Sequence, residues 1–338
     1  MKVILVVDDD ATNLRTLGEL LRPDYRVRLG GSGEDALRIA RSEPRPDLIL
    51  LDVMMPAMDG YEVLRRLQAD EATRGIPVIL VTALHDDDSE QRGFELGAAD
   101  FIHKPIRAAV TLSRIRAHID AKAARDSLQR KAQHMARRAE AATDAALDEA
   151  RDALLGHVVR KGYFPCPAKS ATDGAEDRED PRKCRKNVGL LPWATLGIAG
   201  VDGWSRRLRY AVGREYVWDI RHTVVGEKAN LADGDIDIKT RNIDGTELFL
   251  TTDGGRTPVV ILSHGANGLG ATDQDGNALA PPAAGSDEAR NASPDGRLFY
   301  ARPPSENPAA PGGAFDDRVS WLSPNLIAHR LISAGRLP

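Results

Sequence analysis

The sequence predicts a multidomain chain: a doubly wound α/β domain over residues 1–120, a helical linker over 121–160 and a third, strand-rich part over 161–338. In the first part, short apolar runs alternate with amphipathic stretches, which favours a five-stranded parallel sheet covered on both faces. Residues 107–161 contain no proline and a single glycine, Gly156, among many good helix formers. All four tryptophans lie beyond residue 190, which favours different origins for the two halves.

The elements of the first part are expected in strict alternation. The strands are predicted at 3–7, 25–29, 47–51, 76–81 and 100–103, and the helices at 13–21, 33–41, 60–69, 89–97 and 108–119. Ligands of such a sheet bind beyond the carboxyl ends of its strands. The residues at those ends are therefore the first candidates for a functional site.

Polar residues follow four of these strands. The first strand ends at Asp8 and Asp9, the third at Asp52, the fourth at Thr82 and the fifth at Lys104. Carboxylates that share one sheet edge make an oxygen site that suits Mg²⁺. With that charge neutralised, one carboxylate can attack phosphorus, while Lys104 and Thr82 contact the phosphoryl oxygens. The pattern predicts phosphoryl transfer to an aspartate.

These residues resemble the receiver domain of two-component response regulators over roughly residues 1–120. The motifs that carry the resemblance are "VVDDD", "LILLDVMMPAMDGYEVL", "VILVTAL" and "DFIHKPI". The resemblance implies that Asp52 is the phosphoacceptor and that a histidine kinase or phosphotransfer protein is the donor. It further implies metal ligands at Asp8, Asp9, Asp52 and the Met54 carbonyl, a switch pair of Thr82 and Phe101, and a cis peptide before Pro105.

The linker helix carries a weak apolar repeat. Leu128, Ala132, Met135, Ala139, Ala142 and Ala146 follow a four-three spacing, as the seam of a coiled coil does. We prefer a parallel homodimer through this seam. The alternative is a solvated helix that lies on its own protein. We interpret the arginines along the helix, including Arg137 and Arg138, as a solvated face that does not bind nucleic acid.

Residues 145–338 resemble the globular part of minor pilins and pseudopilins, the assembly subunits of type IV pili and type II secretion systems. The most specific segment is "LPWATLG…DGWSRRLRYAV", supported by "VVILSHGANGLGA" and "FDDRVSWLSPNLIAHRLISAGRLP". The resemblance implies an α+β, pilin-like fold with short strands at 206–212, 215–220, 247–252, 258–264 and 296–302. It also implies a disulfide between Cys166 and Cys184.

The two resemblances conflict over location. A pilin head is bridged in the periplasm, whereas a receiver needs a kinase donor in the cytoplasm. We predict a cytoplasmic protein with reduced cysteines. The net charge of −4 implies no attraction to nucleic acid or anionic lipid, and no run is long enough to cross a bilayer.

The favoured function is a response regulator whose phosphorylation changes how the pilin-like part meets a partner. The alternative is a structural or assembly component of a pilus or type II secretion-related system. We predict no enzymatic output, because no catalytic set is evident outside the first part. Acids at alternate positions in "DGDID" (233–237) and "TDQDGN" (272–277) lack the full pattern of a calcium loop, and we interpret both segments as turns.

Overall fold

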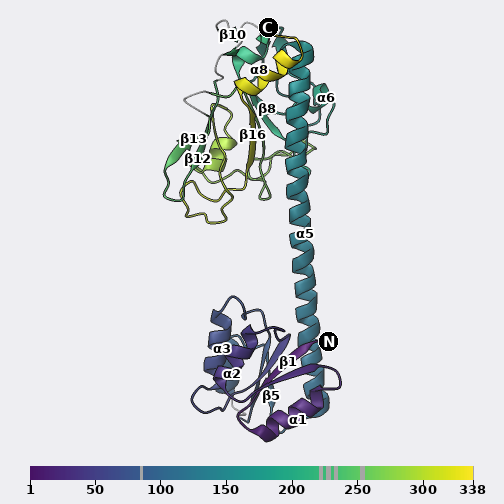
Figure 1. Ribbon diagram of the computed structural model, residues 1–338, viewed down its shortest axis with the longest axis vertical. Coiled ribbons are helices and arrows are strands. Elements are labelled where there is room, and N and C mark those ends of the chain that lie inside the picture. The colour runs from purple at the N-terminus through teal and green to yellow at the C-terminus, as the bar shows by residue number, and fades with distance from the viewer. Residues whose placement is uncertain (84–86, 221–223, 226–229, 232–234, 252–255, 338) are drawn as a thin grey trace. The chain divides into compact units, whose positions relative to one another are not determined.

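The computed structural model divides the chain into two compact units, residues 1–132 and 133–338. It describes residues 1–83, 87–220, 224–225, 230–231, 235–251 and 256–337. One helix, α5 (Ala108–Lys161), belongs to the first unit at its start and to the second at its end (Figure 1). We call the two the N-terminal unit and the C-terminal unit.

The N-terminal unit is built on a five-stranded parallel sheet in the order β2-β1-β3-β4-β5. Its strands are β1 (Val3–Val7), β2 (Arg26–Gly30), β3 (Leu48–Asp52), β4 (Val78–Thr82) and β5 (Asp100–His103). β1, β3 and β4 are buried throughout because helices cover both faces. The prediction of a doubly wound sheet is confirmed. All five carboxyl ends meet at one edge.

Four helices precede α5 in this unit: α1 (Ala11–Leu21), α2 (Gly33–Arg41), α3 (Gly60–Ala69) and α4 (Asp87–Glu95). Apolar residues of α2 and α3 pack on one face of the sheet, and those of α1 and the start of α5 pack on the other. Asp10, Ser32 and Asp59 cap the first three helices, each accepting a hydrogen bond from a backbone N–H of the first turn.

The C-terminal unit contains a four-stranded antiparallel sheet in the order β16-β14-β9-β8. Its strands are β8 (Val188–Leu190), β9 (Arg209–Val212), β14 (Val259–Ser263) and β16 (Arg318–Leu322). One face packs against the second half of α5, through Leu147, Ala150, Leu154 and Val158. The other face packs on a three-stranded sheet of β12 (Asp237–Arg241), β13 (Glu247–Phe249) and β15 (Leu298–Tyr300). The core of the unit therefore lies on both sides of one sheet.

The remaining elements of this unit are short. They are β6 (Arg178–Asp180), β7 (Lys183–Cys184), α6 (Trp193–Leu196), the 3-10 helix η1 (Arg214–Tyr216), β10 (Val224–Val225), β11 (Asn230–Leu231), α7 (Asp287–Asn291) and α8 (Pro324–Ser333). The strand predicted at 215–220 is wrong, because η1 occupies its start and no described residue of that range is in a strand. β16 was not predicted, although Arg318, Val319, Ser320 and Trp321 alternate between polar and apolar as a strand does.

Of the two acidic segments interpreted as turns, 272–277 is described in full. Asp273 accepts hydrogen bonds from the backbone N–H groups of Asp275 and Asn277 and from the Asn277 side chain, so 272–277 is a closed turn, as predicted. Part of 233–237 lies outside the described residues.

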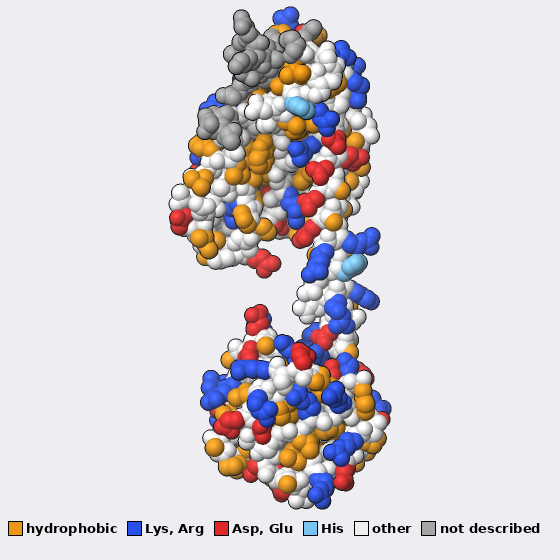
Figure 2. Space-filling view, viewed as in Figure 1, with side chains coloured by type: hydrophobic (Ala, Val, Ile, Leu, Met, Phe, Trp, Pro, Cys, Tyr) orange, Lys and Arg blue, Asp and Glu red, His pale blue; other side chains and the backbone are white. Residues whose placement is uncertain are grey.

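Helix α5 changes character along its length. Leu128 and Met135, the two large residues of the predicted seam, are 68% and 70% exposed. Figure 2 shows basic side chains gathered on this stretch, which contains Arg125, Arg130, Lys131, Arg137 and Arg138. Beyond residue 142 the helix buries a different face, from Thr143 to Val158, against its own unit. The second half therefore follows the alternative we had not preferred, and the seam stays a prediction for the exposed stretch.

Cys166 and Cys184 form a disulfide, with their Cα atoms 5.4 Å apart. The expectation of two reduced thiols is wrong for this structure. The hairpin of β6 and β7 returns the chain so that both cysteines are buried beside Phe164 in the core. Among the described residues, no helix is both long enough and apolar enough to span a bilayer.

Candidate functional site

The edge formed by the carboxyl ends of the parallel strands brings the predicted site residues together. Asp8 and Asp9 directly follow β1, and Asp52 is the last residue of β3. Thr82 ends β4 and is buried, and Lys104 follows β5. Sequence spacing alone predicted this convergence, and the parallel register produces it because neighbouring strands end level with one another.

Lys104 joins two buried carboxylates. Its Nζ atom donates hydrogen bonds to Oδ2 of Asp8 at 3.0 Å and to Oδ1 of Asp52 at 2.6 Å. Asp8 and Asp52 are 1% and 3% exposed. Two carboxylates this deeply buried repel each other strongly unless a positive charge lies between them. The lysine supplies that charge in the described structure.

The local backbone fixes each carboxylate. The second Asp8 oxygen, Oδ1, accepts hydrogen bonds from the Asp10 N–H and the Asn13 side chain. The second Asp52 oxygen accepts one from the Met54 N–H at 3.1 Å. Gly60 lies so close behind that a Cβ atom there would be 2.4 Å from the Asp52 carbonyl oxygen. The sequence analysis missed Asn13 and Gly60, whose roles depend on contacts that spacing does not show.

Burial and neighbouring charge set the protonation of the site. Burial raises the pKa of Asp52, the Asp8 carboxylate raises it further, and the Lys104 hydrogen bond opposes both. Burial alone would lower the pKa of Lys104, but its bonds to Asp52 and Asp8 outweigh burial and raise it. Lys104 therefore remains a cation at neutral pH.

The residues present fit a divalent metal ion. Asp8, Asp9 and Asp52 each offer a carboxylate oxygen, and these oxygens lie within 4.8 Å of one another. Carboxylate oxygens are the ligands that Mg²⁺ prefers, and the exposed Asp9 gives the ion access from solvent. Met54 follows Asp52 closely enough for its carbonyl to contribute, which stays a prediction.

The predicted switch residues lie on neighbouring strands. Phe101 of β5 is 5% exposed, and its ring centroid lies 4.9 Å from that of Phe94. Gly93 makes room for it, since a Cβ there would be 2.4 Å from the Phe101 ring. The peptide bond between Lys104 and Pro105 is cis, as predicted.

A second acid cluster, which the sequence analysis missed, lies in the C-terminal unit. Glu288, Asp316 and Asp317 bring carboxylate oxygens within 4.8 Å of one another. Glu288 is distant in sequence from the other two, so spacing could not reveal the group.

Comparison with known proteins places the first site in a family. Residues 4–116 match the response regulator receiver domain. The chain is 45% identical over 115 residues to the transcriptional regulatory protein AfsQ1 of Streptomyces coelicolor, covering 34% of this chain and 49% of that protein. It is 38% identical over 192 residues to the response regulator PleD of Caulobacter vibrioides, covering 55% and 42%. It therefore spans less than half the length of these relatives.

Solved receiver domains are also similar. That of a Syntrophus aciditrophicus signal transduction histidine kinase is 38% identical, with a TM-score of 0.34, and covers 36% of this chain and 92% of that one. That of the Pseudomonas aeruginosa sensor histidine kinase PA1611, a structure with a magnesium ion in the active-site cleft, is 32% identical, with a TM-score of 0.33, and covers 35% and 98%.

The prediction that this chain has no enzymatic output is wrong, because relatives that share its first domain include an enzyme. A relative that is 40% identical over 125 residues is named a probable cyclic di-GMP phosphodiesterase, from Vibrio cholerae. The match covers 37% of this chain and 28% of that enzyme, and it assigns no activity here.

The pilin resemblance gains no support from these comparisons. The family match ends at residue 116, and none of the relatives named above is a pilin. The comparisons and the geometry agree on the N-terminal part alone. Residues 4–116 of this chain form a response regulator receiver domain.

Proposed function

We propose that this chain is a phosphorelay response regulator in which Asp52 accepts a phosphoryl group from a histidine kinase or phosphotransfer protein. The observation that carries the proposal is the Lys104 ammonium, which lies 2.6 Å from Asp52 and 3.0 Å from Asp8 at an edge that also offers Asp9. A buried carboxylate with a cation beside it is poised to accept a phosphoryl group.

The reaction needs little beyond positioning and charge. A carboxylate oxygen of Asp52 attacks phosphorus, an O–P bond forms, and the N–P bond to the donor histidine breaks, leaving its electron pair on the imidazole nitrogen. Lys104 then exchanges its bond to Asp52 for one to a phosphoryl oxygen, and the Thr82 hydroxyl donates to another. Mg²⁺, held by Asp8, Asp9 and Asp52 with the Met54 carbonyl, would neutralise charge on the phosphoryl oxygens.

The output proposed for the C-terminal unit is protein–protein interaction through a pilin-like fold. Three features support it: a long helix packed along an antiparallel sheet, a second small sheet, and the Cys166–Cys184 disulfide. Thr82 and Phe101 would carry the signal, since a change at either alters the face formed by β5 and the start of α5. We place phosphorylation in the cytoplasm, where the kinase donor resides, so the buried Cys166–Cys184 disulfide is the exception to the reduced state usual in that compartment.

The test is incubation of the full chain with Mg²⁺ and a small acyl-phosphate donor, followed by intact mass. We expect one phosphate adduct in the wild type and none in Asp52→Asn. Because every tryptophan lies in the C-terminal unit, tryptophan emission and oligomeric state report the output separately. Both responses should be absent in Thr82→Ala even if the adduct forms. An adduct that changes neither emission, oligomeric state nor partner binding would refute the signalling function and favour a structural one.

A further inference from the structure

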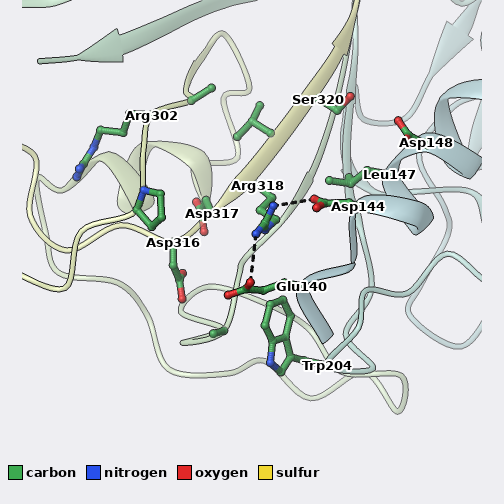
Figure 3. Close-up of a pocket in the computed structure, with 14 residues that line it drawn as sticks. Glu140, Asp144, Leu147, Asp148, Trp204, Arg302, Asp316, Asp317, Arg318 and Ser320 are labelled. Atoms are coloured by element: carbon green, nitrogen blue, oxygen red, sulfur yellow. Dashed lines mark hydrogen bonds and ion pairs between the residues drawn. The ribbon is translucent and has the colours of Figure 1, made fainter. Parts of the chain in front are cut away.

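Two of the three acids of the C-terminal cluster line a cavity. Glu288 belongs to α7, and Asp316 and Asp317 lead into β16. Asp316 and Asp317 line a cavity of about 460 Å³ whose opposite wall is α5, with Glu140, Asp144 and Asp148, and which Trp204 also lines (Figure 3). The cavity is strongly acidic, because its two arginines, Arg302 and Arg318, face five carboxylates.

In each carboxylate of the cluster, one of the two oxygens accepts hydrogen bonds from nearby amide groups. Oε1 of Glu288 accepts hydrogen bonds from the Asn267 side chain at 2.8 Å and the Asp316 N–H at 3.0 Å. Oδ2 of Asp316 accepts one from the Asn267 N–H at 2.7 Å, and Oδ2 of Asp317 accepts one from Asn291 at 2.9 Å. Amide donors thus fix the three groups in place without cancelling their charge.

The other oxygens of the two aspartates have no such partner. Oδ1 of Asp316 and Oδ1 of Asp317 are buried and accept no hydrogen bond from the described residues. The Asp317 side chain is fully buried. A buried, unpaired carboxylate oxygen is costly, so a native structure that keeps two of them in one cluster calls for a missing positive partner.

The nearby basic side chains in the described part of the chain donate no hydrogen bond to these two oxygens. Arg209 is buried and its charge acts on Asp317, but its Nη2 donates to the Ser293 carbonyl at 2.6 Å and its Nε makes no hydrogen bond to the described residues. His264 Nδ1 lies 3.4 Å from Asp317 Oδ1 but makes no hydrogen bond. Arg318 extends toward α5, where it pairs with Asp144 at 2.7 Å and Glu140 at 3.9 Å (Figure 3). Arg302 pairs with Asp287.

The backbone makes space for the cluster. Gly265 has a φ of +58°, and a Cβ atom there would lie 2.2 Å from the Asp316 carbonyl oxygen and 2.4 Å from its Oδ1. A side chain at this position would collide with one of the two unpaired oxygens. The close approach of the 263–268 loop to Asp316 therefore depends on glycine.

We propose that Glu288, Asp316 and Asp317 bind one divalent cation, of the size of Ca²⁺, and that the bound ion holds the start of β16 so that Arg318 remains paired with α5. Oxygens up to 4.8 Å apart can share an ion whose bonds to oxygen are about 2.3–2.6 Å long. Because Asp317 directly precedes Arg318, an ion that holds the Asp317 side chain also restricts the backbone from which the Arg318 side chain extends. The ion would then strengthen the docking of the second half of α5 on its own sheet.

The test uses the full-length, disulfide-bonded chain with Asp9→Asn, which weakens divalent binding at the N-terminal site. After chelation and dialysis, Ca²⁺ is titrated by calorimetry. We expect one site per chain, weakened at least tenfold by Glu288→Gln or Asp316→Asn. Asp148→Asn is the matched control, because it removes an acid from the same cavity wall outside the cluster, and it should bind Ca²⁺ unchanged.

Hydrogen exchange supplies an independent readout. Ca²⁺ should slow exchange in 140–148 and 316–320 of the Asp9→Asn chain, and this protection should vanish with Glu288→Gln. Circular dichroism identifies any variant that does not fold, and the other cluster variant then decides the question. The proposal is overturned if the Asp9→Asn chain takes up no Ca²⁺ at millimolar concentrations, if folded cluster variants bind as well as their parent, if Asp148→Asn abolishes binding, or if Ca²⁺ binds without that protection.

Discussion

The two acid clusters of this protein have similar composition and different surroundings. In each, three carboxylates offer oxygens within 4.8 Å of one another. In the receiver domain Lys104 donates to two of the three, whereas in the C-terminal unit His264 Nδ1 lies 3.4 Å from Asp317 and makes no hydrogen bond to the described residues. A carboxylate with a built-in cation can act as a nucleophile, while a cluster without one needs an ion from solution.

The largest expected effect is on phosphorylation, which should require an acid of the receiver cluster and none of the C-terminal cluster. Asp52→Asn should abolish the phosphate adduct formed from acyl phosphate and Mg²⁺, because an amide oxygen is a poor nucleophile. Asp317→Asn should form the adduct as the wild type does. Intact mass measures both, and an adduct persisting in Asp52→Asn would refute the assignment.

Removing the built-in cation should have the next largest effect. Lys104→Met should slow adduct formation by about 100-fold, because the developing charge on the phosphoryl oxygens loses a preorganised donor. Arg107→Met removes a nearby cation that is not bonded to the acids and should change the initial rate little. Equal rates in wild type and Lys104→Met would contradict the role of the lysine.

His157 tests the effect of burial on a basic group, where burial lowers the pKa instead of raising it as it does for the carboxyl groups. Burial lowers its pKa from 6.5 to about 4, and its Nε2 makes no hydrogen bond to the described residues. The unfolded chain therefore binds a proton first as the pH falls, so stability present above pH 6.5 is lost between about pH 6.5 and 4.

The loss should approach about 3 kcal/mol of unfolding free energy, and His157→Gln should remove that pH dependence. Denaturant unfolding followed by tryptophan emission measures it. The exposed His134→Gln is the control and should keep the wild-type slope. An unchanged slope in His157→Gln would exclude this histidine as the cause.

Neutralising the second cluster should stabilise the C-terminal unit when no cation is present. In chelator, Glu288→Gln should raise its unfolding free energy by an amount on the order of 1 kcal/mol, because one of three mutually repelling buried charges is lost. With Ca²⁺ in excess the order should reverse. Destabilisation by Glu288→Gln in chelator would show that the cluster is compensated by groups of the protein itself.

The smallest effect is expected at the rim of the cavity. Arg318 and Asp144 are 36% and 57% exposed at their side chains, so solvent screens the pair. Arg318→Gln should cost less than about 1 kcal/mol in the same unfolding measurement. A much larger loss would mean that this ion pair holds α5 to the sheet without help from an ion.

Much of the receiver domain could be predicted from sequence. The helix predicted at 33–41 and the strand at 3–7 match α2 and β1, because buried parallel strands and capped amphipathic helices have strong local signatures. In the C-terminal unit, α8 has equally clear local signals, since Ser323 caps it, Pro324 is its first residue and Gly335 lies just past its end at a φ of +65°.

The C-terminal unit was less readable because its strands are short and its loops long. The segment 215–220 has the apolar content of a strand but begins in a 3-10 helix, where Tyr216 packs into the core. The apolar repeat of α5 did not predict the face that the helix buries, because its alanines are compatible with several faces. Packing on the sheet buries the face that carries Leu147 and Leu154.

The sequence by itself determined the receiver site, because its residues follow strands whose parallel direction is predicted by the alternation of strands and helices. Tertiary structure alone decided two things: the buried face of α5, and the meeting of Glu288 with Asp316 and Asp317. Each depends on contacts between segments far apart or ambiguous in sequence, and only the packing of the whole unit specifies which of them meet.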